Sequence, residues 1–118
     1  MWTPSTADSF KAAVAIAARE AVPPELTPLR GLIALHWVAY LPRPKRLMGK
    51  RHGDGPCPAL CKPDRDNIDK AICDALVDAG IIGDDKDIWT GSQRKYYAEK
   101  DGAPRAEIMI SYHHEYGE

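Results

Sequence analysis

The sequence predicts an α+β fold: one small domain, residues 1–118, in which two main helices pack on a small mixed or antiparallel sheet. A length of 118 residues suits a single domain and is short for two. Two segments have a helical apolar period and three have the character of strands. Their order (helix, strand, long loop, helix, strand, strand) is typical of helices that lie on one face of a sheet.

The first half of the chain holds one predicted helix and one predicted strand. Residues 8–21 form the helix, because Phe10 and Val14 recur with a helical period among alanines of high propensity. It ends near Val22, since a residue before proline avoids the helical region. Residues 30–41 are almost continuously apolar, with aromatic and β-branched side chains. This pattern predicts a central and largely covered strand.

The second half begins with an irregular stretch, residues 42–63, that is rich in proline and glycine. Loops of this length in a small domain are usually functional. A helix is predicted over residues 65–79 and ends at Gly80. Its apolar face is formed by Ile68, Ile72, Ala75, Leu76 and Ala79. Two strands follow, residues 87–98 and 105–113, and the Asp101-Gly102 pair between them favours a hairpin turn.

The composition excludes several classes of protein. The formal net charge is −1, so a nucleic-acid partner must be argued from the local placement of charges. No apolar run approaches the roughly 18–20 residues of a membrane span, and no signal peptide is evident. We therefore expect a soluble intracellular protein without a membrane partner. The three cysteines are expected to be reduced thiols. No glycine-rich phosphate-binding motif is present, so no nucleotide cofactor is expected.

The most informative segment is residues 62–70. If its start is extended, the side chains of Asp64 and Asp66 point to the same side, and Lys70 follows on the exposed helix face. Neighbouring carboxylates repel each other, and a divalent cation removes that conflict. Mg²⁺ prefers such oxygen ligands, with Mn²⁺ as a second candidate. A third carboxylate, Asp85, would complete the metal site, and Lys70 would stabilise developing phosphate charge.

Each of these residues also has a simpler structural explanation. Asp66 could only cap the helix, with an acidic capping-box partner three residues later. Lys70 could be a surface lysine in an ion pair, and Asp85 could be a turn residue after Gly83. The remaining aspartates of the helix are expected to form a solvated face: Asp69, Asp74 and Asp78. The combination, rather than any one residue, favours a metal site.

Taken together, these residues resemble the RusA family of Holliday-junction resolvases. The resemblance is carried by Asp64-Arg65-Asp66-Asn67, Lys70, Asp74-Ala75-Leu76 and Asp84-Asp85-Lys86-Asp87-Ile88. It implies that Asp64, Asp66 and Asp85 bind metal and that Lys70 is catalytic. It also implies a homodimer that nicks four-way DNA junctions with Mg²⁺, in recombination or phage DNA processing, in the cytoplasm of a bacterial or phage-infected cell. The sequence departs from the family in having few residues before the first helix.

Basic residues in the long loop suggest where DNA would bind. No acidic residue interrupts the cluster Arg43, Lys45, Arg46, Lys50, Arg51 and His52. Such a segment can follow phosphates without reading bases, although an ordinary solvated loop would have the same composition. Lys62 and Arg65 flank the carboxylates and are expected to steer the scissile phosphate. Trp89 could stack on a DNA base, but core packing or a dimer interface is the favoured explanation.

The sequence therefore predicts a Mg²⁺-dependent endonuclease that hydrolyses phosphodiester bonds in branched DNA. Three alternatives stay open: a dimer that binds branched DNA without cutting it, a metal-dependent phosphatase of small substrates, and a scaffold without a site. The acidic set argues against the first, because carboxylates hinder DNA binding unless a metal ion occupies them. The basic loop argues against the second, because it suits a polymeric substrate.

Overall fold

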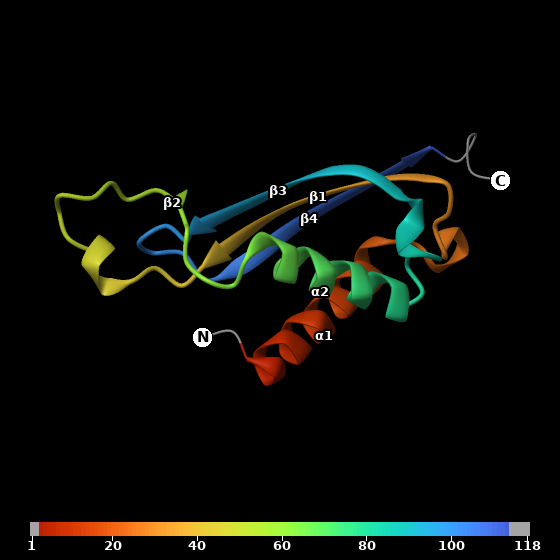
Figure 1. Ribbon diagram of the computed structural model, residues 1–118, viewed down its shortest axis with the longest axis horizontal. Helices are drawn as coiled ribbons and strands as arrows, with labels where there is room; N and C mark the ends of the chain where they lie inside the picture. Colours follow the sequence, from red (N-terminus) through yellow and green to blue (C-terminus); the bar gives the residue numbers. More distant parts are fainter. Residues whose placement is uncertain (1–2, 114–118) are drawn as a thin grey trace.

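Two helices lie on one face of a four-stranded sheet (Figure 1). The computed structural model describes residues 3–113. The strand order is β2-β3-β1-β4. The central strand β1 (Leu32–Leu41) runs parallel to β3 (Ile88–Tyr97) and antiparallel to β4 (Arg105–His113). The short strand β2 (Cys57–Pro58) pairs antiparallel with β3. The predicted α+β class, with a mixed sheet packed by two helices, is confirmed.

The first helix, α1 (Pro4–Ala21), begins earlier than the predicted residue 8. The Thr3 hydroxyl caps it by accepting a hydrogen bond from the Thr6 N–H (3.1 Å). Pro4 suits the first helical position because the N–H that it lacks would have no partner there. The helix ends as predicted, at the C-cap Val22. It packs mainly on the second helix rather than on the sheet.

The second helix, α2 (Arg65–Asp78), covers the sheet with an apolar stripe. Its buried side chains are Ile68, Ala71, Ile72, Ala75 and Leu76. They meet the buried face of β1, formed by Ile33, Leu35, Trp37 and Ala39. Gly80 follows the helix with φ +74°, a conformation that glycine adopts without strain. The sequence period therefore predicted both the buried face and the end of this helix.

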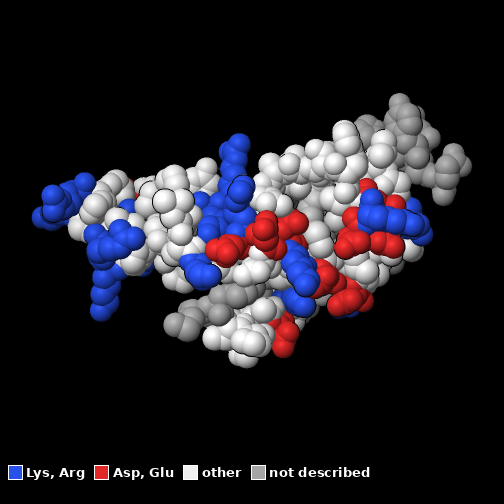
Figure 2. All heavy atoms as spheres, in the orientation of Figure 1, with Lys and Arg blue, Asp and Glu red and all other residues white. Residues whose placement is uncertain are grey.

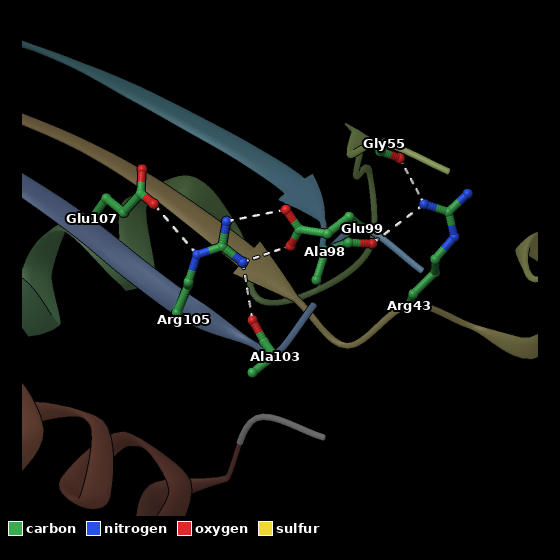
Figure 3. Close-up of polar contacts among 7 residues, drawn as sticks. All are labelled: Arg43, Gly55, Ala98, Glu99, Ala103, Arg105 and Glu107. Carbon is green, nitrogen blue, oxygen red and sulfur yellow. Dashed lines mark hydrogen bonds and ion pairs between the residues drawn. The ribbon is translucent and has the colours of Figure 1, made fainter. Parts of the chain in front are cut away.

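The predicted hairpin between the last two strands is wrong. β4 pairs with β1 and not with β3, so β1 lies between the two strands that the Asp101-Gly102 turn connects. The connection is held by Arg105, whose Nη1 donates to Glu99 Oε1 (2.6 Å) and to the Ala103 carbonyl (3.2 Å) (Figure 3). Burial explains why β4 pairs with β1. Because β1 is the most apolar strand, it takes the centre of the sheet, and this outweighs the preference of the Asp101-Gly102 turn for a hairpin between β3 and β4.

The expectation that β1 is largely covered holds for one face only. Alternate residues of β1 are buried, and those between them are partly exposed. Both helices lie on the same side of the sheet, so the opposite side has no helical layer (Figure 1). Within residues 3–113, no helix combines the length and apolar character that crossing a membrane would require.

Asp69 does not belong to a solvated helix face, as the sequence had suggested. The indole of Trp37, which is 1% exposed, donates a hydrogen bond from Nε1 to Asp69 Oδ1 (2.8 Å). This bond joins the middle of β1 to α2 over the core. Asp69 is therefore a structural residue, while Asp74 pairs with Lys11 of α1 (3.6 Å).

Replacing Asp69 with alanine is expected to lower the free energy of unfolding by about 1–3 kcal/mol, because it leaves the buried indole N–H without an acceptor. Asp69→Asn keeps an acceptor oxygen and should cost less. Urea denaturation of both variants measures the difference. Asp78→Ala, at an exposed position of the same helix, is the control and should stay within about 0.5 kcal/mol of the unchanged protein. Equal stability of all three variants would contradict a role for this bond.

Candidate active site and nucleic-acid interface

Asp64 and Asp66 lie together at the start of α2. Asp64 is the N-cap, and its backbone carbonyl accepts hydrogen bonds from the N–H groups of Asn67 (3.1 Å) and Ile68 (3.2 Å). Its carboxylate makes no capping bond. Asp64 has an extended backbone, but Arg65 and Asp66 are already helical, so residues 64–66 are not extended throughout, and the cap is Asp64 rather than Asp66. Both carboxylates are exposed and form no side-chain hydrogen bond or ion pair with the described residues, so they are available to a ligand.

The two aspartates line a shallow hollow of about 490 Å³. Its other lining residues are Pro58, Ala59, Leu60, Arg65 and Lys95. Lys95 of β3 fixes the segment that leads into α2: its Nζ donates to the carbonyls of Cys61 (2.5 Å) and Pro63 (2.8 Å). An ammonium group has three donors, so one remains for a ligand in the hollow. No local sequence pattern indicated this role of Lys95, because its partners lie more than thirty residues away in the chain.

Lys70 is exposed one helical turn after Asp66, as the spacing predicted. It forms no ion pair with Asp66 or with Asp74 among the described residues, and Asp74 is paired with Lys11 instead. The explanation of Lys70 as a surface ion-pair partner therefore has no support in the structure. Its ammonium group can reach toward an anion bound near the start of α2.

Asp85 opens a short 3-10 helix, η3 (Asp85–Asp87), directly before β3. The two other acidic residues of this turn have structural partners. Asp84 Oδ1 accepts from the Lys86 N–H (3.0 Å), and this bond, with one shared with Asp85, lowers the pKa of Asp84. Asp87 is bound by Arg30 Nε (2.8 Å). The turn is thus fixed at both ends and presents Asp85, which is exposed, toward solvent.

Asp85 belongs to the η3 turn, which lies against α2. Its charge acts on Cys73 of that helix: burial, then the charges of Asp69 and Asp85, raise the pKa of the Cys73 thiol to about 12.

The donor set of one chain fits a hydrated divalent ion with two protein ligands. Among residues 3–113, no group of three His, Cys, Asp or Glu side chains is arranged to hold a metal ion. Asp64 and Asp66 are brought together, and Asp85 does not form a cluster with them. Mg²⁺ commonly uses one or two carboxylates together with waters and substrate phosphates, so the exposed pair suits it.

A family model described as endodeoxyribonuclease RusA matches residues 1–111. The chain belongs to the RusA endodeoxyribonuclease family. No curated protein matches the sequence significantly. RusA enzymes are crossover-junction endodeoxyribonucleases, so the chain is an enzyme of the Holliday-junction-resolving type that acts on branched DNA. The resemblance carried by residues 62–88 is thereby confirmed.

The long loop of this RusA protein is held in place by two cations. Arg43 donates four hydrogen bonds to backbone carbonyls. Figure 3 shows two of them, to the carbonyls of Gly55 (2.8 Å) and Ala98 (3.3 Å). The other two go to the carbonyls of Leu47 (2.9 Å) and Gly53 (2.9 Å). Lys100 Nζ donates to the carbonyls of Gly49 (2.8 Å) and His52 (2.5 Å). Arg43, predicted as a DNA contact, therefore has most of its five donors occupied within the protein.

The other predicted DNA contacts of the RusA chain are exposed: Lys45, Arg46, Lys50, Arg51, Lys62 and Arg65. Figure 2 shows Lys and Arg side chains gathered at the end of the molecule formed by the loop, and Asp and Glu toward α2 and η3. Arg46 also acts on Tyr97 of β3: a hydrogen bond with Cys61 raises the pKa of Tyr97, and the Arg46 guanidinium partly opposes this.

Proposed function

We propose that this RusA-family enzyme nicks four-way DNA junctions by Mg²⁺-dependent hydrolysis of phosphodiester bonds, in recombination or phage DNA processing. The observation that supports the proposal most is the pair of exposed carboxylates at the start of α2, Asp64 and Asp66, which have no partner among residues 3–113. They line a hollow that also contains cationic groups, which suits a metal ion and a phosphate together. A cytoplasmic site of action in a bacterial or phage-infected cell follows from this DNA substrate.

The chain's own residues would bind and orient the scissile phosphate. Asp64 and Asp66 would hold the metal ion, which when bound lowers the pKa of a coordinated water and stabilises charge on the leaving oxygen. Lys70, one helical turn further, would stabilise the negative charge that develops on the phosphate. Lys62 and Arg65, on either side of Asp64, would keep that phosphate over the hollow.

We further propose that the protein acts as a homodimer and that Asp85 joins the metal site across the subunit boundary. Two observations support this: Asp85 is exposed on a fixed turn, and one chain does not group it with Asp64 and Asp66. A two-fold dimer would contain two equivalent sites, each with Asp85 from the partner subunit. Such symmetry suits a four-way junction, which offers two equivalent strands.

The exposed cations of the loop would follow the DNA backbone. Lys45, Arg46, Lys50 and Arg51 are presented on a loop that Arg43 and Lys100 hold in one shape. Because this shape exists before binding, little conformational entropy is lost when phosphates are bound. Contacts of this kind supply affinity but no sequence preference.

A synthetic mobile four-way junction tests the proposed function. We expect paired nicks on opposing strands with Mg²⁺ or Mn²⁺ and none with EDTA, and an affinity that falls steeply with salt because each neutralised phosphate releases a counterion. Mapping the nicks on all four labelled strands is the measurement. Binding without nicks under any divalent ion would favour a non-cleaving dimer. Hydrolysis of small phosphate esters but not of DNA would favour a phosphatase.

A further inference from the structure

Trp89, the second residue of β3, is exposed to solvent and does not belong to the core. Its side chain is 63% exposed, although Ile88 beside it packs against the core. The expectation of core packing is therefore wrong. An indole is among the costliest side chains to leave in water, since it could bury a large apolar area. An indole that is exposed to this extent accordingly calls for an explanation.

Trp89 follows Ile88, whose side chain packs on the core side, so its own side chain points to the side of the sheet without a helical layer. Trp89 also lies at a β-bulge. In the pairing of β1 with β3, Ile33 is opposite Ile88, and the next residue, Ala34, is opposite Thr90. Trp89 is thus the extra residue of β3, without a partner in β1. Bulges bend a strand locally and occur often beside active sites.

Glycine at position 91 keeps the strand in this shape. A Cβ at Gly91 would collide with the backbone carbonyl of Leu35, so only glycine allows the two strands to approach so closely just after the bulge. On the other side, Asp87 is tied to Arg30 by the 2.8 Å ion pair. The backbone that carries Trp89 is therefore fixed on both sides, and the exposed ring has a rigid support.

We propose that Trp89 stacks on an unpaired base at the branch point of the DNA junction and thereby favours junctions over duplex. The proposal rests on the proposed function, specifically on the role of Asp85. If Asp85 approaches the scissile phosphate, the bases next to that phosphate pass within reach of a ring only four residues further along the chain. An indole face binds any base by stacking, and it gains nothing from a duplex, where every base is already stacked.

The test compares three substitutions at one position. Trp89→Ala should lower the affinity for a four-way junction by about tenfold and leave the affinity for a duplex of the same length unchanged. Trp89→Phe keeps an aromatic face and should lose less. Trp89→Leu keeps apolar bulk without that face and should resemble Trp89→Ala. Met109→Ala, at a residue that is 66% exposed on the edge strand β4, is the control.

Gel shifts in EDTA measure binding without cleavage, and a junction with 2-aminopurine at the branch point reports stacking directly. We expect the unchanged protein to quench this probe and Trp89→Ala not to. Equal junction affinity and equal quenching in the two proteins would overturn the inference. So would a change from dimer to monomer in Trp89→Ala during sedimentation, because Trp89 would then belong to a subunit interface. Cleavage of the same junction by the unchanged protein is scored separately, and its failure would refute the proposed function instead.

Discussion

Asp66→Asn is expected to abolish junction cleavage and to leave junction binding almost unchanged. Asparagine has nearly the same size but lacks the charge that holds a divalent ion. Metal stabilisation of the transition state is worth several kcal/mol, so the single-turnover rate should fall by about 10²–10⁴-fold. Removal of a negative charge from a surface that faces phosphates does not weaken binding. A cleavage assay and a gel shift on the same four-way junction measure both quantities.

The structure also supplies the controls for this substitution. The Asp66 carboxylate has no partner among the described residues, so its loss should not destabilise the fold. A melting temperature within a few degrees of the unchanged protein checks this. Asp78→Asn removes the same charge from the far end of α2 and should cut at the normal rate. Lys70→Ala should lose cleavage as Asp66→Asn does. Full cleavage by Asp66→Asn would show that this carboxylate holds no essential metal ion.

The parts of the site that the sequence predicted are those fixed by local geometry. Asp64, Asp66 and Lys70 lie within seven residues, so one helix start determines how they relate to one another. The apolar stripe of α2 was predicted for the same reason, because a helical period is a local property. The place of β4 beside β1 was not predicted, since it depends on which strand is buried most rather than on the turn that precedes it.

Other features could not be predicted because their partners are backbone carbonyls distant in the chain. Nothing in the sequence distinguishes Lys95, which holds the segment before Asp64, from a solvated lysine. The same applies to Arg43, which the composition of its loop assigned to DNA. The exposure of Trp89 depends on which side of the sheet the helices cover, and that is settled by packing between segments far apart in sequence. Sequence patterns indicate which residue types are present but not which carbonyls they meet.

Subunits with Asp66→Asn and subunits with Asp85→Asn are each expected to be inactive alone and active as a heterodimer. If Asp85 serves the partner's site, the heterodimer contains one site with both substitutions and one with neither. The intact site should work at the normal rate, so activity per dimer should be about half that of the unchanged protein. Each bound heterodimer should nick only one of the two equivalent strands of the junction. Two different affinity tags allow the heterodimer to be purified and assayed.

A second heterodimer has the opposite expected activity, so the pair distinguishes a metal site shared between subunits from a site within one chain. It joins an unchanged subunit to one that carries both Asp66→Asn and Asp85→Asn. If the metal site is shared between subunits, each of its two sites contains one substitution and the dimer is inactive. If Asp85 instead serves its own chain, the unchanged subunit keeps a complete site and this dimer is the active one, while the first heterodimer is inactive. The two preparations carry the same substitutions in equal number. A difference in activity can therefore arise only from which chains contribute the carboxylates at one metal ion.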